Sequence, residues 1–162
     1  MIARADDYFL GVLHSRVHEL WTRAKGTQLR EAESGFRYSQ TTTFETFPFP
    51  WPPGAEPAGD QHVQAIAVAA RRLVELRGNW LHLPGANAEE LKKRTLTNLY
   101  NIRPTWLALA HQTLDNMVAV AYGWPTDLGD EEVLSRLLAL NEERTRQRGT
   151  GTDAEATKRA TT

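Results

Sequence analysis

The stretch FRYSQTTTFETFPFPWPP, residues 36–53, limits the folds that this chain can adopt. Its last six positions hold four prolines, which fix φ, remove backbone donors and push the preceding residues away from the helix. Residues 41–47 are mostly β-branched or aromatic and favour extended backbone. We call residues 36–53 the strap. An extended segment with this many aromatic side chains must pack against something, and its packing partner is the functional question.

Helical periodicity flanks the strap on both sides. Apolar residues recur at three- and four-residue spacing, and Asp6 or Asp7, Asp60 and Asp130 stand where N-caps would. Gly123 followed by Pro125 predicts the end of one helix. We therefore expect a mainly α fold, a bundle of about four to five helices with the extended strap. The predicted helices cover about 7–25, 61–81, 88–100, 104–122 and 130–147.

The order of these segments predicts three parts. Residues 1–53, one helix plus the strap, are too few to fold alone, so they are expected either to dock on the helical part or to be the end of a larger domain. Residues 54–147 are expected to form a helical domain. Residues 148–162 contain no large apolar side chain and are expected to be a disordered tail.

Composition excludes several classes of protein. The chain has 162 residues and no cysteine, so it has neither disulfides nor thiolate metal sites. It has no apolar run near the roughly 20 residues of a membrane span, and we expect a cytoplasmic protein. The net charge is −1, but basic residues dominate the early and middle parts and acidic ones the late part. This asymmetry fits either one basic face for phosphate or ordinary solvated helix faces, and charge alone favours the latter.

Three short patterns suggest enzymatic chemistry only weakly. His14 and His18 have the spacing of two zinc ligands, but neither a glutamate base nor a third ligand accompanies them, so packing histidines are favoured. Glu90-Leu91-Lys92 matches half of a nuclease motif but falls in a predicted helix. Gly149-Thr150-Gly151 lacks the strand and helix of a phosphate loop. An Asn-Pro-Pro-aromatic motif is also absent, so we expect no active site within this chain.

The strap offers binding chemistry instead. Arginine and glutamine can read purine edges, and hydroxyl groups commonly hold phosphates, although residue types alone slightly favour hydroxyls that satisfy local turns. Its bulky side chains are expected to be docking anchors rather than base-stacking platforms. These anchors are Phe44, Phe47, Phe49 and Trp51.

Four phrases together resemble one protein family. They are DDYFLGVLHSRVHELW (6–21), FRYSQTTTFETFPFP (36–50), LKKRTLTNLYN (91–101) and AYGWP (121–125). In this order they resemble the C-terminal end of large bacterial DNA methyltransferases of the MmeI-like restriction-modification class. The resemblance implies a modular parent enzyme, which uses S-adenosylmethionine to methylate an adenine amino group and in some members carries a nuclease. It also implies that this chain matches the end of the target recognition domain and the helical region after it.

The resulting hypothesis is a non-catalytic part of an adenine-specific DNA methyltransferase that supports target recognition and domain packing. No cofactor is expected in this chain, whereas S-adenosylmethionine is implied for the parent. The expected partners are DNA, the methyltransferase domain or a partner chain, and a second copy of the chain. The alternatives are a helical protein-interaction module and, less favoured, a small metalloenzyme using His14 and His18. The candidate DNA or interdomain contacts are Arg37, Tyr38, Ser39, Thr41, Thr42, Lys92, Lys93 and Arg94.

Overall fold

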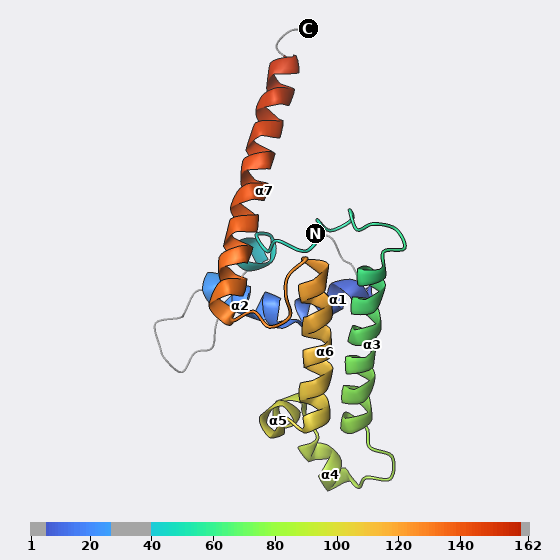
Figure 1. Cartoon of the computed structure of the whole chain (residues 1–162). Coiled ribbons are helices and arrows are strands. Elements are labelled where there is room, and N and C mark those ends of the chain that lie inside the picture. The colour runs from blue at the N-terminus through green and yellow to red at the C-terminus, as the bar shows by residue number, and fades with distance from the viewer. Residues whose placement is uncertain (1–5, 27–39, 160–162) are drawn as a thin grey trace. The chain divides into compact units, whose positions relative to one another are not determined.

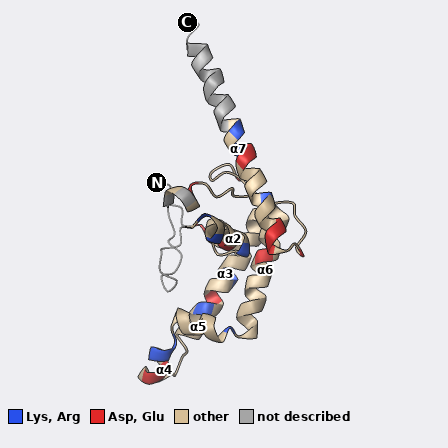
Figure 2. Cartoon of the chain, turned by 90° about the vertical axis from the view of Figure 1, so that its left-hand side faces the viewer, with Lys and Arg blue, Asp and Glu red and all other residues tan. Residues whose placement is uncertain are grey.

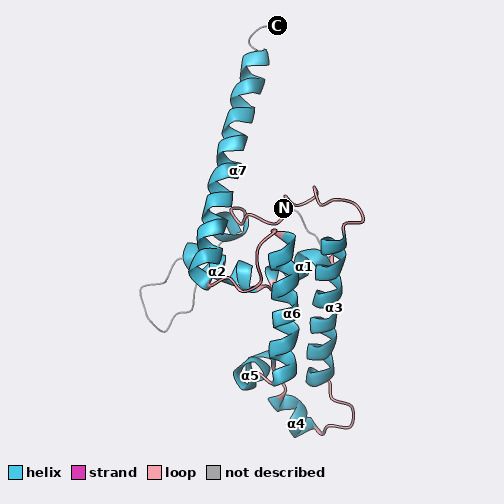
Figure 3. Cartoon of the chain, viewed as in Figure 1, coloured by secondary structure: helices cyan, strands magenta, loops and turns pink. Residues whose placement is uncertain are grey.

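A computed structural model describes the backbone of residues 6–26 and 40–159, with side chains described there except at 40, 42 and 148–159. These residues form seven α-helices and one π-helical turn, and none of them is in a strand (Figures 1 and 3). The elements are α1 (Asp7–Leu13), α2 (Arg16–Lys25), η1 (Gln40–Phe44), α3 (Gln61–Leu81), α4 (Ala88–Lys93), α5 (Leu96–Ile102), α6 (Thr105–Ala121) and α7 (Asp130–Arg159). The predicted mainly α fold is confirmed, but there are more helices than the expected four to five.

The first predicted helix is divided between α1 and α2. The amide of Ser15 and its hydroxyl both donate to the carbonyl of Val12, at 3.2 and 2.7 Å. The amide of Arg16 donates to the Asp115 carboxylate at 2.7 Å, instead of continuing the helical ladder. A contact with a residue distant in sequence thus starts a new helix, because the carboxylate satisfies the first free amide of α2.

The helix predicted for 88–100 is also divided. Asn87 and Glu90 form a reciprocal capping box at the start of α4. The Thr95 hydroxyl then accepts from the amide of Asn98 and caps α5. This second N-cap falls inside the predicted helix, and it explains why the segment forms two short helices.

The chain forms two compact units, and the first comprises residues 1–16 and 56–126. Within it α3 packs along α6, and α1 packs against α3 (Figure 1). Gly11 permits the close approach of α1, since a Cβ there would lie 2.7 Å from Cγ2 of Ile66. The fully buried side chains include Val12, Ile66, Leu73, Leu99, Leu107, Leu114 and Val118.

The predicted end of α6 at Gly123 is confirmed. Gly123 has φ of +73° and donates to the Val120 carbonyl, and Trp124 donates to the Ala119 carbonyl. These two bonds form a Schellman motif, which favours glycine at the left-handed position. The rings of Tyr122 and Trp124 stack at 4.3 Å just beyond the helix.

The second unit comprises residues 17–55 and 127–162, and contains most of α2, η1, the described strap residues and α7. Its buried side chains include Trp21, Phe47, Phe49, Val133 and Leu137. The expectation of extended backbone is wrong for residues 40–44, which form η1. Strand preference is weak and context-dependent, and local packing overrides it here.

Two expectations about organisation stay predictions. The boundary at residues 53 and 54 is one, since compactness groups the chain differently. The tail from residue 148 is the other, because the backbone of α7 continues to Arg159 while the side chains beyond 147 lie outside the described set. Among the described helices, none has the length and apolar character that crossing a membrane would require.

Candidate docking surface and nucleic-acid interface

Aromatic rings of the strap pack on α2 within the second unit. We call His18, Trp21, Phe44, Phe47 and Phe49 the aromatic cluster. Phe47 meets His18 edge-on at 4.8 Å and Phe49 at 4.8 Å, and lies 6.3 Å from Trp21. Phe44 meets Phe49 at 6.1 Å. Edge-to-face pairs of this kind add specific attraction to the burial of apolar area, so the cluster joins the strap to α2.

Two polar contacts fix the backbone beside this cluster. The indole N–H of Trp21 donates to the Thr43 carbonyl at 3.0 Å, which ties η1 to α2. The Arg144 guanidinium, on α7, donates to the carbonyls of Phe49 and Pro50 at 2.6 and 3.1 Å. A proline-rich segment makes few backbone bonds of its own, and the guanidinium supplies donors to two of its carbonyls.

The predicted anchors therefore pack inside this chain. Phe47 and Phe49 are buried, and Phe44 and Trp51 are half-buried. Trp21, Phe47 and Phe49 are buried within the second unit, because α2 and the strap cover one another.

The structure describes only part of the predicted contact set. Arg37, Tyr38 and Ser39 lie outside the described residues, as does the side chain of Thr42, while Thr41 is exposed on η1. Because Thr43 is fully buried two residues later, the C-terminal end of this candidate segment is attached to a packed core.

The three basic residues near α4 have different surroundings. Lys92 and Lys93 are exposed, and Lys92 pairs with Glu89 at 2.8 Å, so α4 carries charges of both signs (Figure 2). Arg94 donates to the Trp80 carbonyl at 2.8 Å and stacks over its indole at 5.0 Å. Arg94 thus joins the end of α3 to the start of α5, which is a structural contact.

The enzyme-like patterns do not gather into a site. His14 follows α1 and is partly exposed and partly buried, whereas His18 is buried in the aromatic cluster, and the helix break separates them. Glu90 is used by the capping box of α4. No group of three or more potential metal ligands occurs within the described portion of the chain.

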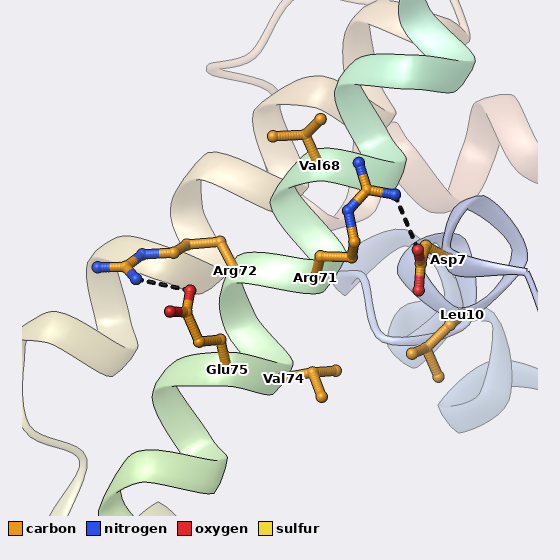
Figure 4. Close-up of a pocket in the computed structure, with 7 residues that line it drawn as sticks. All are labelled: Asp7, Leu10, Val68, Arg71, Arg72, Val74 and Glu75. Carbon is orange, nitrogen blue, oxygen red and sulfur yellow. Dashed lines mark hydrogen bonds and ion pairs between the residues drawn. The ribbon is translucent and has the colours of Figure 1, made fainter.

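A groove on the outer face of α3 carries two arginines that sequence reasoning did not single out. Arg71 pairs with Asp7 at 2.9 Å and Arg72 pairs with Glu75 at 2.7 Å, and the apolar side chains of Val68 and Leu10 line the same groove (Figure 4). Both arginines are thus neutralised by acidic neighbours, which makes the groove a poor site for an anion.

Sequence reasoning also missed a second polar group in the first unit. Arg77 donates to the Tyr100 hydroxyl at 3.2 Å, and that hydroxyl lies 2.8 Å from Nε2 of His111. The residues come from α3, α5 and α6, and no local pattern relates them. Arg144 was missed for the same reason, since its partners lie 94 and 95 residues away.

Comparisons with known proteins agree on one relationship. The family described as "MmeI, target recognition domain" matches residues 1–51. DNA methyltransferase A of Bacillus subtilis (strain 168) is 32% identical over 147 residues, 90% of this chain but 14% of that protein. The Type IIL restriction-modification enzyme MmeI, solved in complex with DNA, has 26% identity and a TM-score of 0.66 over 90% of this chain and 17% of its own. The chain is thus an MmeI-like sequence, related to a region of the restriction-modification DNA methyltransferases.

Proposed function

We propose that this chain serves target recognition in an adenine-specific, S-adenosylmethionine-dependent DNA methyltransferase of the restriction-modification class, without performing catalysis itself. The match of residues 1–51 to the MmeI target recognition domain carries this proposal. The chain spans 14% of the length of the curated methyltransferase that it matches. The methyl-transfer chemistry and its cofactor would therefore belong to other parts of a longer enzyme or to a partner chain.

The packing of the strap supports a recognition role. The aromatic cluster and Arg144 hold residues 43–50 against α2 and α7. Residues 37–42, which include the candidate contacts of the strap, immediately precede this anchored part. Contacts held by a rigid scaffold lose less conformational entropy on binding than contacts on a free segment. In this proposal the strap acts as the anchored base of a DNA-contacting segment.

Salt-dependent DNA binding tests the proposal. The full chain is titrated onto a labelled duplex, and anisotropy is followed at several salt concentrations. We expect weak binding whose logarithm falls with the logarithm of salt concentration, by about one unit of slope for each phosphate contact. Arg37→Gln should lower the slope by about one. Arg136→Gln, which removes a surface arginine paired with Glu132 on α7, is the matched control and should leave the slope unchanged.

Binding that is absent at low salt would overturn DNA contact by this chain, and an equal effect of the two variants would overturn its assignment to the strap.

A second role is favoured by exposed apolar residues in the first unit. Leu91, Leu96 and Ile102 are 41, 49 and 67% exposed on α4 and α5. Exposed apolar side chains are typical of a docking site where they form one contiguous patch, and this second role requires that these three do. Light scattering tests this role: association that Ile102→Asp abolishes would support it, and a monomer at all concentrations would count against self-association.

A further inference from the structure

Three side chains from different elements meet in the first unit, His14 lies within range of the charge on one of them, and the proposed function uses none of these residues. We call His14, Arg77, Tyr100 and His111 the Arg77 cluster. His14 follows α1, and the others lie on α3, α5 and α6. Each is at least partly accessible to solvent.

Hydrogen-bond chemistry fixes the direction of one of the two contacts. A guanidinium has donors and no acceptor, so the Tyr100 oxygen accepts from Arg77 at 3.2 Å. The same oxygen lies 2.8 Å from Nε2 of His111, and a phenol hydroxyl can either donate to an imidazole nitrogen or accept from it. The two rings also meet edge-on at 5.6 Å.

Arg77 carries a positive charge that is not paired with a carboxylate. No ion pair involves it within the described part of the chain, in contrast to Arg71 and Arg72 on the same helix. Burial, and secondly the Arg77 charge, lower the pKa of His14.

We propose that the Arg77 cluster binds a phosphate group, either inorganic phosphate or a phosphodiester of a nucleic acid. Arginine presents several N–H donors in a geometry that matches phosphate oxygens. The hydroxyl of Tyr100 and the two imidazoles add groups that can donate to the same anion. A phosphate would neutralise the guanidinium and favour the charged form of both histidines. This site does not depend on DNA recognition by the strap, and either idea can fail alone.

Proton NMR of the full chain tests the site directly. The imidazole signals of His14 and His111 are followed while inorganic phosphate is added, and sodium chloride at equal ionic strength serves as the reference. We expect phosphate to move both signals saturably and to raise the pKa of His14, whereas chloride should do neither. Equal effects of phosphate and chloride, or no saturation, would overturn the proposal.

Variants assign the effect to the cluster. Arg77→Gln should weaken phosphate binding by about tenfold, because it removes the charged donor of the cluster. Tyr100→Phe keeps the ring and its packing, removes only the hydroxyl, and should weaken binding several-fold even where Arg77→Gln does not fold. Arg72→Gln, on the same helix but paired with Glu75, is the matched control. Equal weakening by Arg72→Gln would overturn the assignment.

The same titration repeated with a DNA duplex distinguishes between inorganic phosphate and a nucleic-acid backbone as the ligand. Saturation of the His14 and His111 signals by both ligands would identify a nucleic-acid backbone as the partner. Saturation by inorganic phosphate alone would identify a small anion. Saturation by neither ligand contradicts the site, whatever the strap does in the anisotropy measurement.

Discussion

Gly11 is the residue at which α1 and α3 come closest. A Cβ at this position would lie 2.7 Å from the Ile66 side chain and 3.1 Å from that of Ala70. We expect Gly11→Ala to destabilise the protein by about 1–3 kcal/mol, because overpacking outweighs the roughly 1 kcal/mol gained in helix propensity. Chemical denaturation followed by circular dichroism measures the change.

The control for this prediction is another helical glycine. A Cβ at Gly78 on α3 would meet no described atom within 4 Å, so Gly78→Ala should stabilise by up to about 1 kcal/mol. We therefore expect Gly11→Ala to lower the free energy of unfolding and Gly78→Ala to raise it. Stabilisation by both would show that α1 does not pack on α3 as described.

Arg144 is the residue that holds the proline-rich end of the strap. Arg144→Met keeps much of the aliphatic stem but leaves the carbonyls of Phe49 and Pro50 without their guanidinium donors. We expect a loss of about 1 kcal/mol, since water can reach part of this half-buried site. Arg136→Met breaks only a surface ion pair on the same helix and should cost less. Unfolding followed by fluorescence compares the two variants, and an equal loss of unfolding free energy in both would rule out the Arg144 contact.

At the scale of elements, the sequence predicted helix ends that depend on neighbouring residues but not those that depend on residues far along the chain. Asp60 caps α3 and Gly123 ends α6, as the sequence predicted, because each acts on amides or carbonyls of its own turn. The break between α1 and α2 depends on Asp115, 99 residues from Arg16, which no window of sequence contains.

The candidate site shows the same division. The strap was recognisable from its prolines and aromatic residues, and so was its need for a packing surface. That surface, α2 together with Arg144 of α7, was not predictable, because strand propensity favoured extended backbone where η1 forms. Likewise Arg94 looked like part of a basic patch, whereas its stacking on Trp80 depends on where α3 ends.

The end of α7 provides a prediction about an element. Residues 148–162 include no large apolar side chain, so removing them should leave the unfolding midpoint nearly unchanged. Leu137→Ala, on the same helix but fully buried, should cost about 2–4 kcal/mol. Thermal unfolding of both variants provides the test. A truncated chain as unstable as the Leu137 variant would show that the tail contributes to the fold.

At the scale of the whole molecule, His14 makes stability depend on pH. Burial and Arg77 lower its pKa in the folded state below the ordinary value of 6.5, so at intermediate pH the unfolded chain binds more protons. The contribution of His14 is therefore fully present above about pH 6.5 and is lost as pH falls through the lowered pKa. Denaturation midpoints should decrease on acidification across this window.

His14→Gln separates this effect from the general loss of stability in acid. The variant should show a smaller decrease in the denaturation midpoint between about pH 7 and pH 5, because its side chain takes up no proton in either state. His62→Gln is the matched control, since that histidine lies in the first turn of α3, away from Arg77, and it should retain the wild-type slope. An unchanged slope of denaturation midpoint against pH in His14→Gln would contradict the lowered pKa.

Added phosphate should also reduce this slope in the wild-type chain if the Arg77 cluster binds it, because a bound anion opposes the charge that keeps His14 neutral.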